Sequence, residues 1–183
     1  MDEYMREVKR LFEAPLKPAS LLTMSEQLQE QFRQKLKESD ISMLPSYNHT
    51  LPTGHERGTF LALDVGGSTF RVAVVQLCGK ESTDTGMKIA KMRSFRIDKR
   101  IRDLKGYYFF DWMAERIEEV LADPEWDFYR RTTLSMGLAW SFPIEQTSIR
   151  SGNLLEMGKG FNATHGVKGQ DLGELIMSAC RAR

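Results

Sequence analysis

The residues best suited to chemistry lie in the stretch Asp64-Val-Gly-Gly-Ser-Thr-Phe-Arg71, which combines an acid, two glycines, two hydroxyls and a guanidinium. Gly66 and Gly67 suit a tight turn because they accept positive φ and let another group approach the backbone closely. Exposed N–H groups in such a turn can cradle an anion, and hydroxyls add donors. Asp64 would repel a phosphate unless a cation lay between them. The stretch therefore suggests a metal–nucleotide phosphate site.

The same stretch also fits an ordinary hairpin. Apolar runs over residues 60–65 and 70–78 flank the glycines and predict two antiparallel strands joined by a tight turn. The pattern is not a P-loop, because no Gly-Lys-Ser/Thr follows and no helix is predicted to begin there. Taken alone, the stretch does not decide between a phosphate site and a structural turn.

Two further polar residues stand where a site would be expected. Ser141 follows a predicted strand over 134–140, and strand ends often carry ligand contacts. Lys159 lies in Gly158-Lys-Gly-Phe161, an ammonium between two flexible glycines and an aromatic anchor. Each of these residue types is more often structural when taken alone. No Ser–His–Asp grouping includes Ser141, so nucleophilic catalysis is not supported.

The charge balance gives no reason to expect a nucleic-acid partner. The chain has 26 Lys and Arg against 25 Asp and Glu, a formal net charge of +1. Basic residues do cluster between Arg93 and Lys105, but Asp98 and Asp103 interrupt them. This segment is interpreted as a solvated edge and loop.

Histidine, cysteine and hydropathy patterns narrow the class of protein further. The three histidines lack metal-ligand spacing, which argues against a zinc site. Cys78 and Cys180 lie far apart, as expected of a reduced, intracellular chain. No apolar run is long enough to cross a bilayer. We expect a cytoplasmic protein with no membrane partner.

The remaining elements predict an α/β or α+β layer. Residues 1 to about 40 have helical periodicity, which Pro15 and Pro18 interrupt, and Thr23 with Glu26 predicts a capping box. Further expected elements are strands over 60–65, 70–78, 87–97 and 134–140, a helix over 107–122 ended by Asp123-Pro124, a loop over 141–146, and a helix over 170–181 with Leu172, Leu175, Ile176 and Ala179 on one face.

Three blocks follow one another along the chain: Leu51-Pro-Thr-Gly-His-Glu-Arg-Gly-Thr-Phe-Leu-Ala-Leu-Asp-Val-Gly-Gly-Ser-Thr-Phe-Arg71, Ser141-Phe-Pro-Ile-Glu-Gln146 and Gly158-Lys-Gly-Phe161. In this order they resemble the eukaryotic hexokinase and glucokinase family. Together they are far more specific than any single block, and the resemblance covers essentially the whole chain. It implies an α/β actin-like ATPase (ribonuclease H-like) fold, here incomplete, with a mixed sheet, an antiparallel hairpin and flanking helices.

The resemblance also implies an activity and a site. The family transfers the γ-phosphoryl group of magnesium ATP to the 6-hydroxyl of a hexose such as glucose. Carried over residue by residue, the resemblance implies that a phosphate loop is formed by Gly66, Gly67, Ser68 and Thr69, and that Arg71 contacts the phosphates. Asp64 would lie near hydrated magnesium without direct ligation. Ser141 and Lys159 would bind the hexose beside a wall formed by Phe142 and Pro143.

The chain departs from the family pattern at two places in the site. The usual Gly-Gly-Thr-Asn is Gly-Gly-Ser-Thr at 66–69, and the usual Trp-Thr before Lys159 is Met157-Gly158. Thr69 lacks the amide, and Gly158 lacks the hydroxyl that would bond the sugar. An unmatched polar group of this kind costs on the order of 1–3 kcal/mol.

The family's Asn-Asp-Thr-Val-Gly-Thr segment, whose Asp is the general base, does not occur in the 183 residues. We therefore expect an N-terminal portion of a hexokinase, inactive by itself. Residues 1–52 would be a helical segment that packs with the large lobe, and residues 53–183 a small-lobe portion. The runner-up is a non-catalytic hexokinase-like regulator or sugar sensor. A remote third reading is an unrelated α/β binding module.

Overall fold

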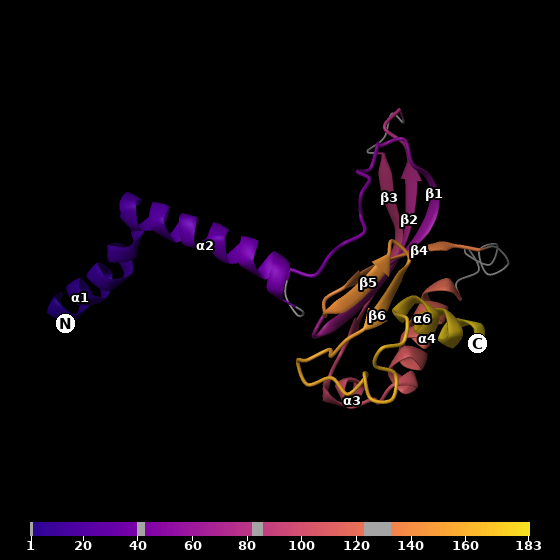
Figure 1. Cartoon of the computed structure of the whole chain (residues 1–183). Helices are drawn as coiled ribbons and strands as arrows, with labels where there is room; N and C mark the ends of the chain where they lie inside the picture. Colours follow the sequence, from indigo (N-terminus) through magenta and orange to yellow (C-terminus); the bar gives the residue numbers. More distant parts are fainter. Residues whose placement is uncertain (1, 40–42, 82–85, 123–132) are drawn as a thin grey trace. The chain divides into compact units, whose positions relative to one another are not determined.

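The computed structural model describes residues 2–39, 43–81, 86–122 and 133–183 of the chain (Figure 1). They belong to two compact units, residues 1–44 and 45–183. The expected boundary at residue 52 was defined by packing with a large lobe, and it stays a prediction.

The N-terminal unit consists of α1 (Asp2–Glu13), a 3-10 turn over Ala14–Leu16 and α2 (Pro18–Glu38). The predicted helices and their interruption by prolines are confirmed. The capping box is wrong, because Thr23 and Glu26 lie inside α2. The helix begins at Pro18, since proline at the first helical position has no N–H to leave unpaired and presets φ. Neither helix has a buried side chain.

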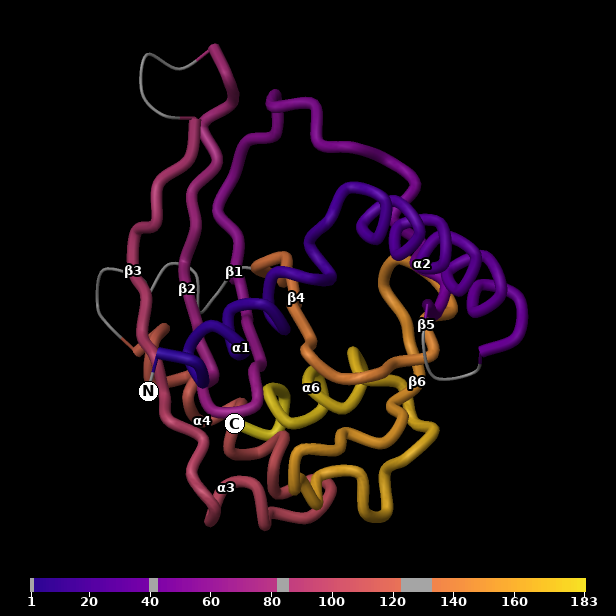
Figure 2. The backbone as a smooth tube through the Cα atoms, turned by 90° about the vertical axis from the view of Figure 1, so that its left-hand side faces the viewer, coloured from indigo at the N-terminus to yellow at the C-terminus, as the bar shows by residue number. Residues whose placement is uncertain are grey.

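The second unit is built on a four-stranded mixed sheet in the order β3-β2-β1-β4 (Figure 2). The strands are β1 (Arg57–Val65), β2 (Thr69–Cys78), β3 (Met87–Arg96) and β4 (Ser135–Trp140). β1 pairs antiparallel with β2 and β2 with β3, whereas β4 runs parallel to β1. The predicted strands and the hairpin are confirmed.

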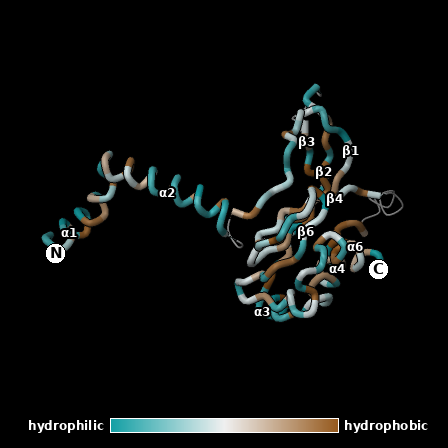
Figure 3. The backbone as a smooth tube through the Cα atoms, in the orientation of Figure 1, coloured by the Kyte–Doolittle hydropathy of each residue, from teal (hydrophilic) through white to brown (hydrophobic). Residues whose placement is uncertain are grey.

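One face of this sheet is covered by α4 (Tyr107–Leu121), which contacts α6 (Leu172–Arg181). Strand residues alternate between faces, so each strand turns every second side chain toward the helix. The apolar character of β1, β2 and α4 is visible in Figure 3. The buried apolar side chains that they contribute are Leu61, Leu63, Val65, Phe70, Val72, Val74, Phe109, Phe110, Met113, Ile117 and Val120.

The last helix matches its prediction, and its stripe Leu172, Leu175, Ile176 and Ala179 is buried. Asp171 caps it by accepting a hydrogen bond from the N–H of Glu174 at 2.9 Å. The predicted stop at Asp123-Pro124 falls outside the described residues. No helix in the described ranges is long and apolar enough to cross a bilayer.

Two segments differ from the prediction. The expected loop over 141–146 ends early, because β5 (Ile144–Ser148) begins right after Pro143 and pairs antiparallel with β6 (Ser151–Leu154). The strand predicted over 87–97 is confirmed as the exposed edge strand β3, but part of the loop expected after it forms the short α3 (Lys99–Arg102), capped by Asp98. Both segments are polar and short, so they lack the apolar periodicity that sequence analysis depends on.

Candidate functional site

The glycine turn joins β1 to β2 and is held in place on two sides. The N–H of Gly66 donates to the carbonyl oxygen of Thr69 at 2.9 Å, which closes the turn. The carbonyl oxygen of Ser68 accepts from the N–H of Ile97 at 2.9 Å, which ties the turn to the end of β3. The Gly66 N–H is used by the turn itself, so donation to an anion would fall to its neighbours.

Of the two reasons predicted for Gly66 and Gly67, positive φ is wrong and close approach of another group is confirmed. Neither Gly66 nor Gly67 has φ in the left-handed region. Close approach of neighbouring atoms explains both glycines. A Cβ at Gly67 would lie 3.1 Å from Cδ of Lys159, and one at Gly66 would lie 3.3 Å from the carbonyl oxygen of Thr69. Both distances are tighter than ordinary van der Waals contact.

Asp64 is paired with Arg71 directly across the hairpin. The two residues are partners in the strand register, and Nη1 of Arg71 donates to Oδ2 of Asp64 at 2.6 Å. Both side chains are about half exposed. The Arg71 guanidinium thus places a positive charge of the protein beside this carboxylate.

The described residues do not form a direct metal cage. No group of three or more His, Cys, Asp or Glu side chains among them could hold a metal ion. Asp64 is the carboxylate nearest in sequence to the glycine turn, and one carboxylate fits a hydrated magnesium ion better than a dehydrated one. A water-mediated role for Asp64 stays a prediction.

Ser141 lies directly beside the glycine turn. Its N–H donates to the carbonyl oxygen of Val65 at 3.1 Å, so the loop after β4 starts where β1 ends. The next side chain, Phe142, is buried between Trp140 and Phe161, with ring centroids 5.3 and 5.0 Å away. Pro143 is exposed and leads into β5. The aromatic contacts therefore fix the Ser141 loop.

Lys159 reaches the same place from the loop between β6 and α6. Its Nζ donates to the carbonyl oxygen of Ser141 at 3.2 Å and lies 4.9 Å from the ring centroid of Phe142. A cation over an aromatic face is attracted to the ring's electrons. Because the lysine stem also lies over Gly67, Lys159 links the loop after β4 to the glycine turn.

The backbone around Lys159 is unusual. Gly158, Lys159 and Gly160 have φ values of 61°, 52° and 76°. Glycine adopts this conformation freely, whereas a residue with a Cβ does so at a cost of order 1–3 kcal/mol. The turn is closed by donation from the Phe161 N–H to the Gly158 carbonyl oxygen at 3.0 Å, and the Phe161 ring is buried.

The sequence pattern did not predict the side-chain hydrogen bonds that Glu156 accepts near this loop. Glu156 accepts from the hydroxyl of Thr164 at 3.0 Å and from Nζ of Lys168 at 2.8 Å. These bonds, first the one from Lys168 and then the one from Thr164, lower the pKa of Glu156. Its partners lie too far along the chain for local spacing to signal them.

The geometry thus brings together the segments that the sequence singled out. Contacts join the glycine turn, Ser141 with Phe142, and Lys159 at one end of the sheet. The hydrogen bond between Lys159 and Ser141 places side by side the two residues to which the resemblance assigns one hexose. The ligands assigned to these residues stay predictions.

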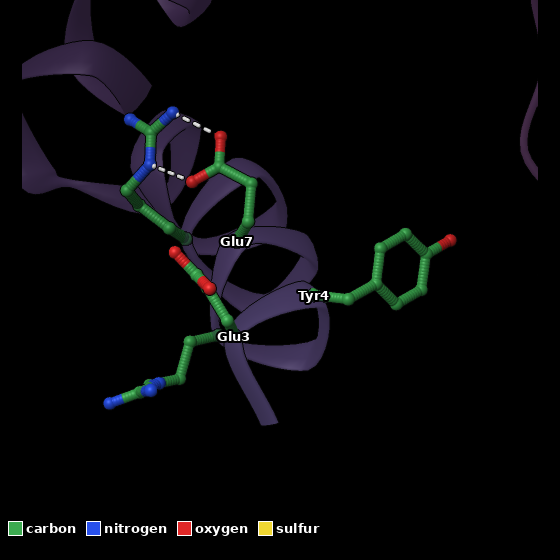
Figure 4. A pocket seen from close by; sticks show the side chains of 5 residues that line it. Glu3, Tyr4 and Glu7 are labelled. Carbon is green, nitrogen blue, oxygen red and sulfur yellow. Dashed lines mark hydrogen bonds and ion pairs between the residues drawn. The ribbon is translucent and has the colours of Figure 1, made fainter. Parts of the chain in front are cut away.

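Two surface hollows lie elsewhere. One is on α1 and is formed by exposed side chains of that single helix, among them Tyr4 and Glu7 (Figure 4). Glu7 there pairs with Arg10, which lowers the pKa of Glu7. The other, of about 660 Å³, runs along β4 beside β5, β6 and α6. Neither hollow is lined by Asp64, Gly67, Ser141 or Lys159.

Comparison with known sequences gives one family. A family profile described as Hexokinase matches residues 5–183. Hexokinase-3 of Rattus norvegicus is 33% identical over 187 residues, covering 96% of this chain and 19% of that protein. N-acetylglucosamine kinase 1 of Candida albicans is 29% identical over 174 residues, covering 93% and 35% respectively.

Solved structures agree with the sequence comparison. A hexokinase from Schistosoma mansoni complexed with glucose superposes with a TM-score of 0.69 at 31% identity, over 82% of this chain and 32% of that one. Another hexokinase structure matches 97% of this chain with a TM-score of 0.68 at 22% identity, which supports the fold alone. The chain therefore spans about a third or less of the first relatives it matches.

Proposed function

The chain belongs to the hexokinase family, and from this membership and the geometry at Lys159 we propose that it forms part of an ATP-dependent hexose kinase. The reaction is transfer of a phosphoryl group to the 6-hydroxyl of a glucose-like hexose. The observation that carries the proposal is the convergence of Lys159, Ser141 and the glycine turn at one end of the sheet.

On this proposal the hexose binds at Ser141 and Lys159. The Lys159 ammonium has three N–H donors and uses one on the Ser141 carbonyl, so donors remain for sugar hydroxyls. The Ser141 hydroxyl adds a donor and an acceptor. Phe142 holds the lysine in place through the face of its ring.

The phosphate end of the reaction is assigned to the hairpin. Backbone N–H groups at Gly67 and Ser68, the Ser68 and Thr69 hydroxyls and Arg71 would bind the phosphates of ATP. Magnesium, when bound with ATP, would supply positive charge near Asp64. Phosphoryl transfer depends on positioning and charge stabilisation more than on covalent participation, which suits this residue set.

The general base is not assigned to any residue of this chain. The family's Asn-Asp-Thr-Val-Gly-Thr segment is absent from the 183 residues, and the matched relatives are several times longer. We propose that these residues bind substrates but do not turn them over by themselves. The large lobe of the family fold would be the required partner.

The proposal is tested in two steps on the 183-residue chain. Titration with glucose, followed by NMR, should show saturable shifts at Ser141 and Lys159. A coupled assay with glucose, magnesium and ATP should give no turnover above a mock-purified control. Absence of any glucose-dependent shift at either residue would contradict their role in binding. Clear turnover would contradict the proposal that the general base lies outside these 183 residues.

The second candidate, a non-catalytic regulator or sugar sensor, is favoured by Gly158. This glycine stands where the family has a threonine, and a Cβ there would meet nothing within 4 Å. The hydroxyl that a threonine would offer the sugar is therefore absent. Activity measurements on a longer form of the protein that contains the general-base segment separate the candidates, since a regulator would bind hexose without phosphorylating it.

A further inference from the structure

We infer that Gly67 is a positioning residue for Lys159, because the absence of a side chain at Gly67 lets the lysine stem lie across the glycine turn. The resemblance assigned Gly67 to phosphate binding only. The inference deepens the proposed function and rests on it for the use of the lysine, whereas the contact itself is a property of the fold.

The distances define the contact. An ideal Cβ on Gly67 would lie 3.1 Å from Cδ of Lys159 and 3.9 Å from both its Cε and its Nζ. The backbone of Gly67 is not left-handed, so its conformation does not by itself require glycine. The space above Gly67 is therefore filled by the lysine.

A side chain at Gly67 would move the lysine rather than the turn. The turn is fixed by the Gly66 to Thr69 bond and by the Ser68 to Ile97 bond. The lysine side chain is flexible and exposed. Relief of the clash would therefore move Nζ away from the Ser141 carbonyl oxygen and the Phe142 ring, which now lie 3.2 and 4.9 Å from it.

The glycine turn and the lysine thus act as one unit. The glycine turn lies under the lysine stem, and the Ser141 carbonyl oxygen accepts from the tip. A change in the turn is transmitted to the ammonium that the proposed function gives to the hexose. Gly67 acts through Lys159 and needs no contact with the sugar.

The test is Gly67→Ala in the 183-residue chain, read first without ligand. The Lys159 methylene protons near Phe142 should carry a ring-current shift in their NMR signals. Gly67→Ala should move these signals toward those of an ordinary exposed lysine, as Phe142→Leu should. Gly137→Ala is the matched control and should leave them unchanged, because a Cβ at Gly137 meets nothing within 4 Å. Unchanged Lys159 signals in Gly67→Ala would overturn the inference.

Glucose titration then separates the inference from the proposed function. Gly67→Ala should weaken glucose binding by about threefold to tenfold, since a displaced charged donor loses part of its hydrogen bond. If the Lys159 signals move but no form of the chain binds glucose, the positioning contact is supported and the proposed function fails. If the Lys159 signals move but glucose affinity is unchanged, the inference that Gly67 positions Lys159 for sugar binding is overturned.

A second variant covers the case in which Gly67→Ala does not fold. In the Lys159→Ala background the added Cβ has no lysine stem to meet, so the double variant should fold like Lys159→Ala alone. Such non-additivity is the signature of a direct contact. If both variants with alanine at position 67 fail to fold, the turn itself rejects a side chain and the inference is overturned.

Discussion

Lys159 donates from Nζ to the main-chain carbonyl oxygen of Ser141 across 3.2 Å, although the two residues belong to different loops. The contact depends on the Phe142 ring beneath the ammonium and on the bare backbone of Gly67 beside the stem. These contacts join the separate motifs of the sequence, the glycine turn, Ser141 and Lys159, into one candidate site.

Substitution of Lys159 by Met should lower glucose affinity by about tenfold or more, because a charged hydrogen bond of about 1.5–3 kcal/mol is lost. The fold should be retained, since the lysine side chain is exposed. Calorimetric titration of the 183-residue chain with glucose is the measurement. Lys99→Met is the matched control, because Lys99 is exposed and pairs only with Asp103 of its own helix end among the contacts described. Equal affinity in Lys159→Met and the parent would contradict the assignment.

Removal of the Asp64 charge should strengthen phosphate binding when magnesium is absent. A carboxylate about 4 Å from a phosphate in water costs about 1 kcal/mol, so Asp64→Asn should bind inorganic phosphate about fivefold more tightly. Arg71→Met should have the opposite effect, because the guanidinium that pairs with Asp64 is lost. Titrations of both variants in a magnesium chelator measure this.

The stability of these variants serves as the control. The Asp64–Arg71 pair is about half exposed, and such pairs contribute about 0–1 kcal/mol. Both variants should therefore unfold near the parent temperature. Unchanged phosphate binding by Asp64→Asn, in a chain of unchanged stability, would show that the carboxylate does not face the bound anion.

The sequence predicted the hairpin well because its signal is local. Apolar runs on both sides of Gly66 and Gly67 predict two antiparallel strands joined by a tight turn, and β1 and β2 pair in this way. The helix over residues 170–181 was predicted for a similar reason, since its buried stripe has a helical period. The sequence also predicted structural roles for Phe142 and Phe161, the aromatic side chains that anchor the site loops.

Local sequence patterns do not predict contacts between segments that lie far apart in the chain. The stem of Lys159 lies against Gly67, and no local pattern relates the two residues. β5 was missed because Glu145 to Ser148 are polar and follow a proline. The start of α2 was misplaced because Thr23 and Glu26 match a capping box by spacing, whereas Pro18 begins the helix.

Glu56 should remain ionised in the folded protein down to about pH 2. Hydrogen bonds from the Thr53 N–H, its own backbone N–H and the Thr53 hydroxyl, with one from the Gly54 N–H, lower the pKa of Glu56 from 4.5 to about 2. A carboxyl with a lowered folded pKa stabilises the fold above its unfolded pKa. That contribution is lost as the pH falls from about 4.5 toward about 2.

The check is an NMR titration of the Glu56 carboxyl together with acid unfolding of Glu56→Gln. The variant should lose less stability than the parent between pH 4.5 and 2, because it has no proton to take up at this position. A Glu56 midpoint near 4.5 in the folded parent would contradict the hydrogen-bond network.

Asp171→Ala should destabilise the second unit by about 1–3 kcal/mol. Oδ2 accepts from the Ser151 hydroxyl at 2.5 Å and from the Gly152 N–H at 2.9 Å, and Oδ1 caps α6. Burial raises the pKa of Asp171, but these hydrogen bonds outweigh it, and the net pKa is lowered. The carboxylate thus fastens β6 to the last helix.

Chemical denaturation measures the effect of Asp171→Ala. Asp103→Ala is the control, because Asp103 forms a surface pair with Lys99 and should change stability by less than about 1 kcal/mol. Equal midpoints for the two variants would show that the Asp171 network contributes no more than a surface pair.

The N-terminal helices should be the first segments cleaved by trypsin. Neither α1 nor α2 has a buried side chain, and their large apolar residues, such as Tyr4, Phe12 and Leu22, are exposed. Most helical stability in proteins comes from tertiary packing, so helices without buried side chains open often enough for a protease to bind. The strands over 60–78, in contrast, contribute the buried side chains Leu63, Val65 and Phe70. Limited digestion with mass mapping should place the first cuts within residues 2–38 and the later ones within 60–160. First cuts within 60–78, with the N-terminal helices intact, would show that this division of the chain is wrong.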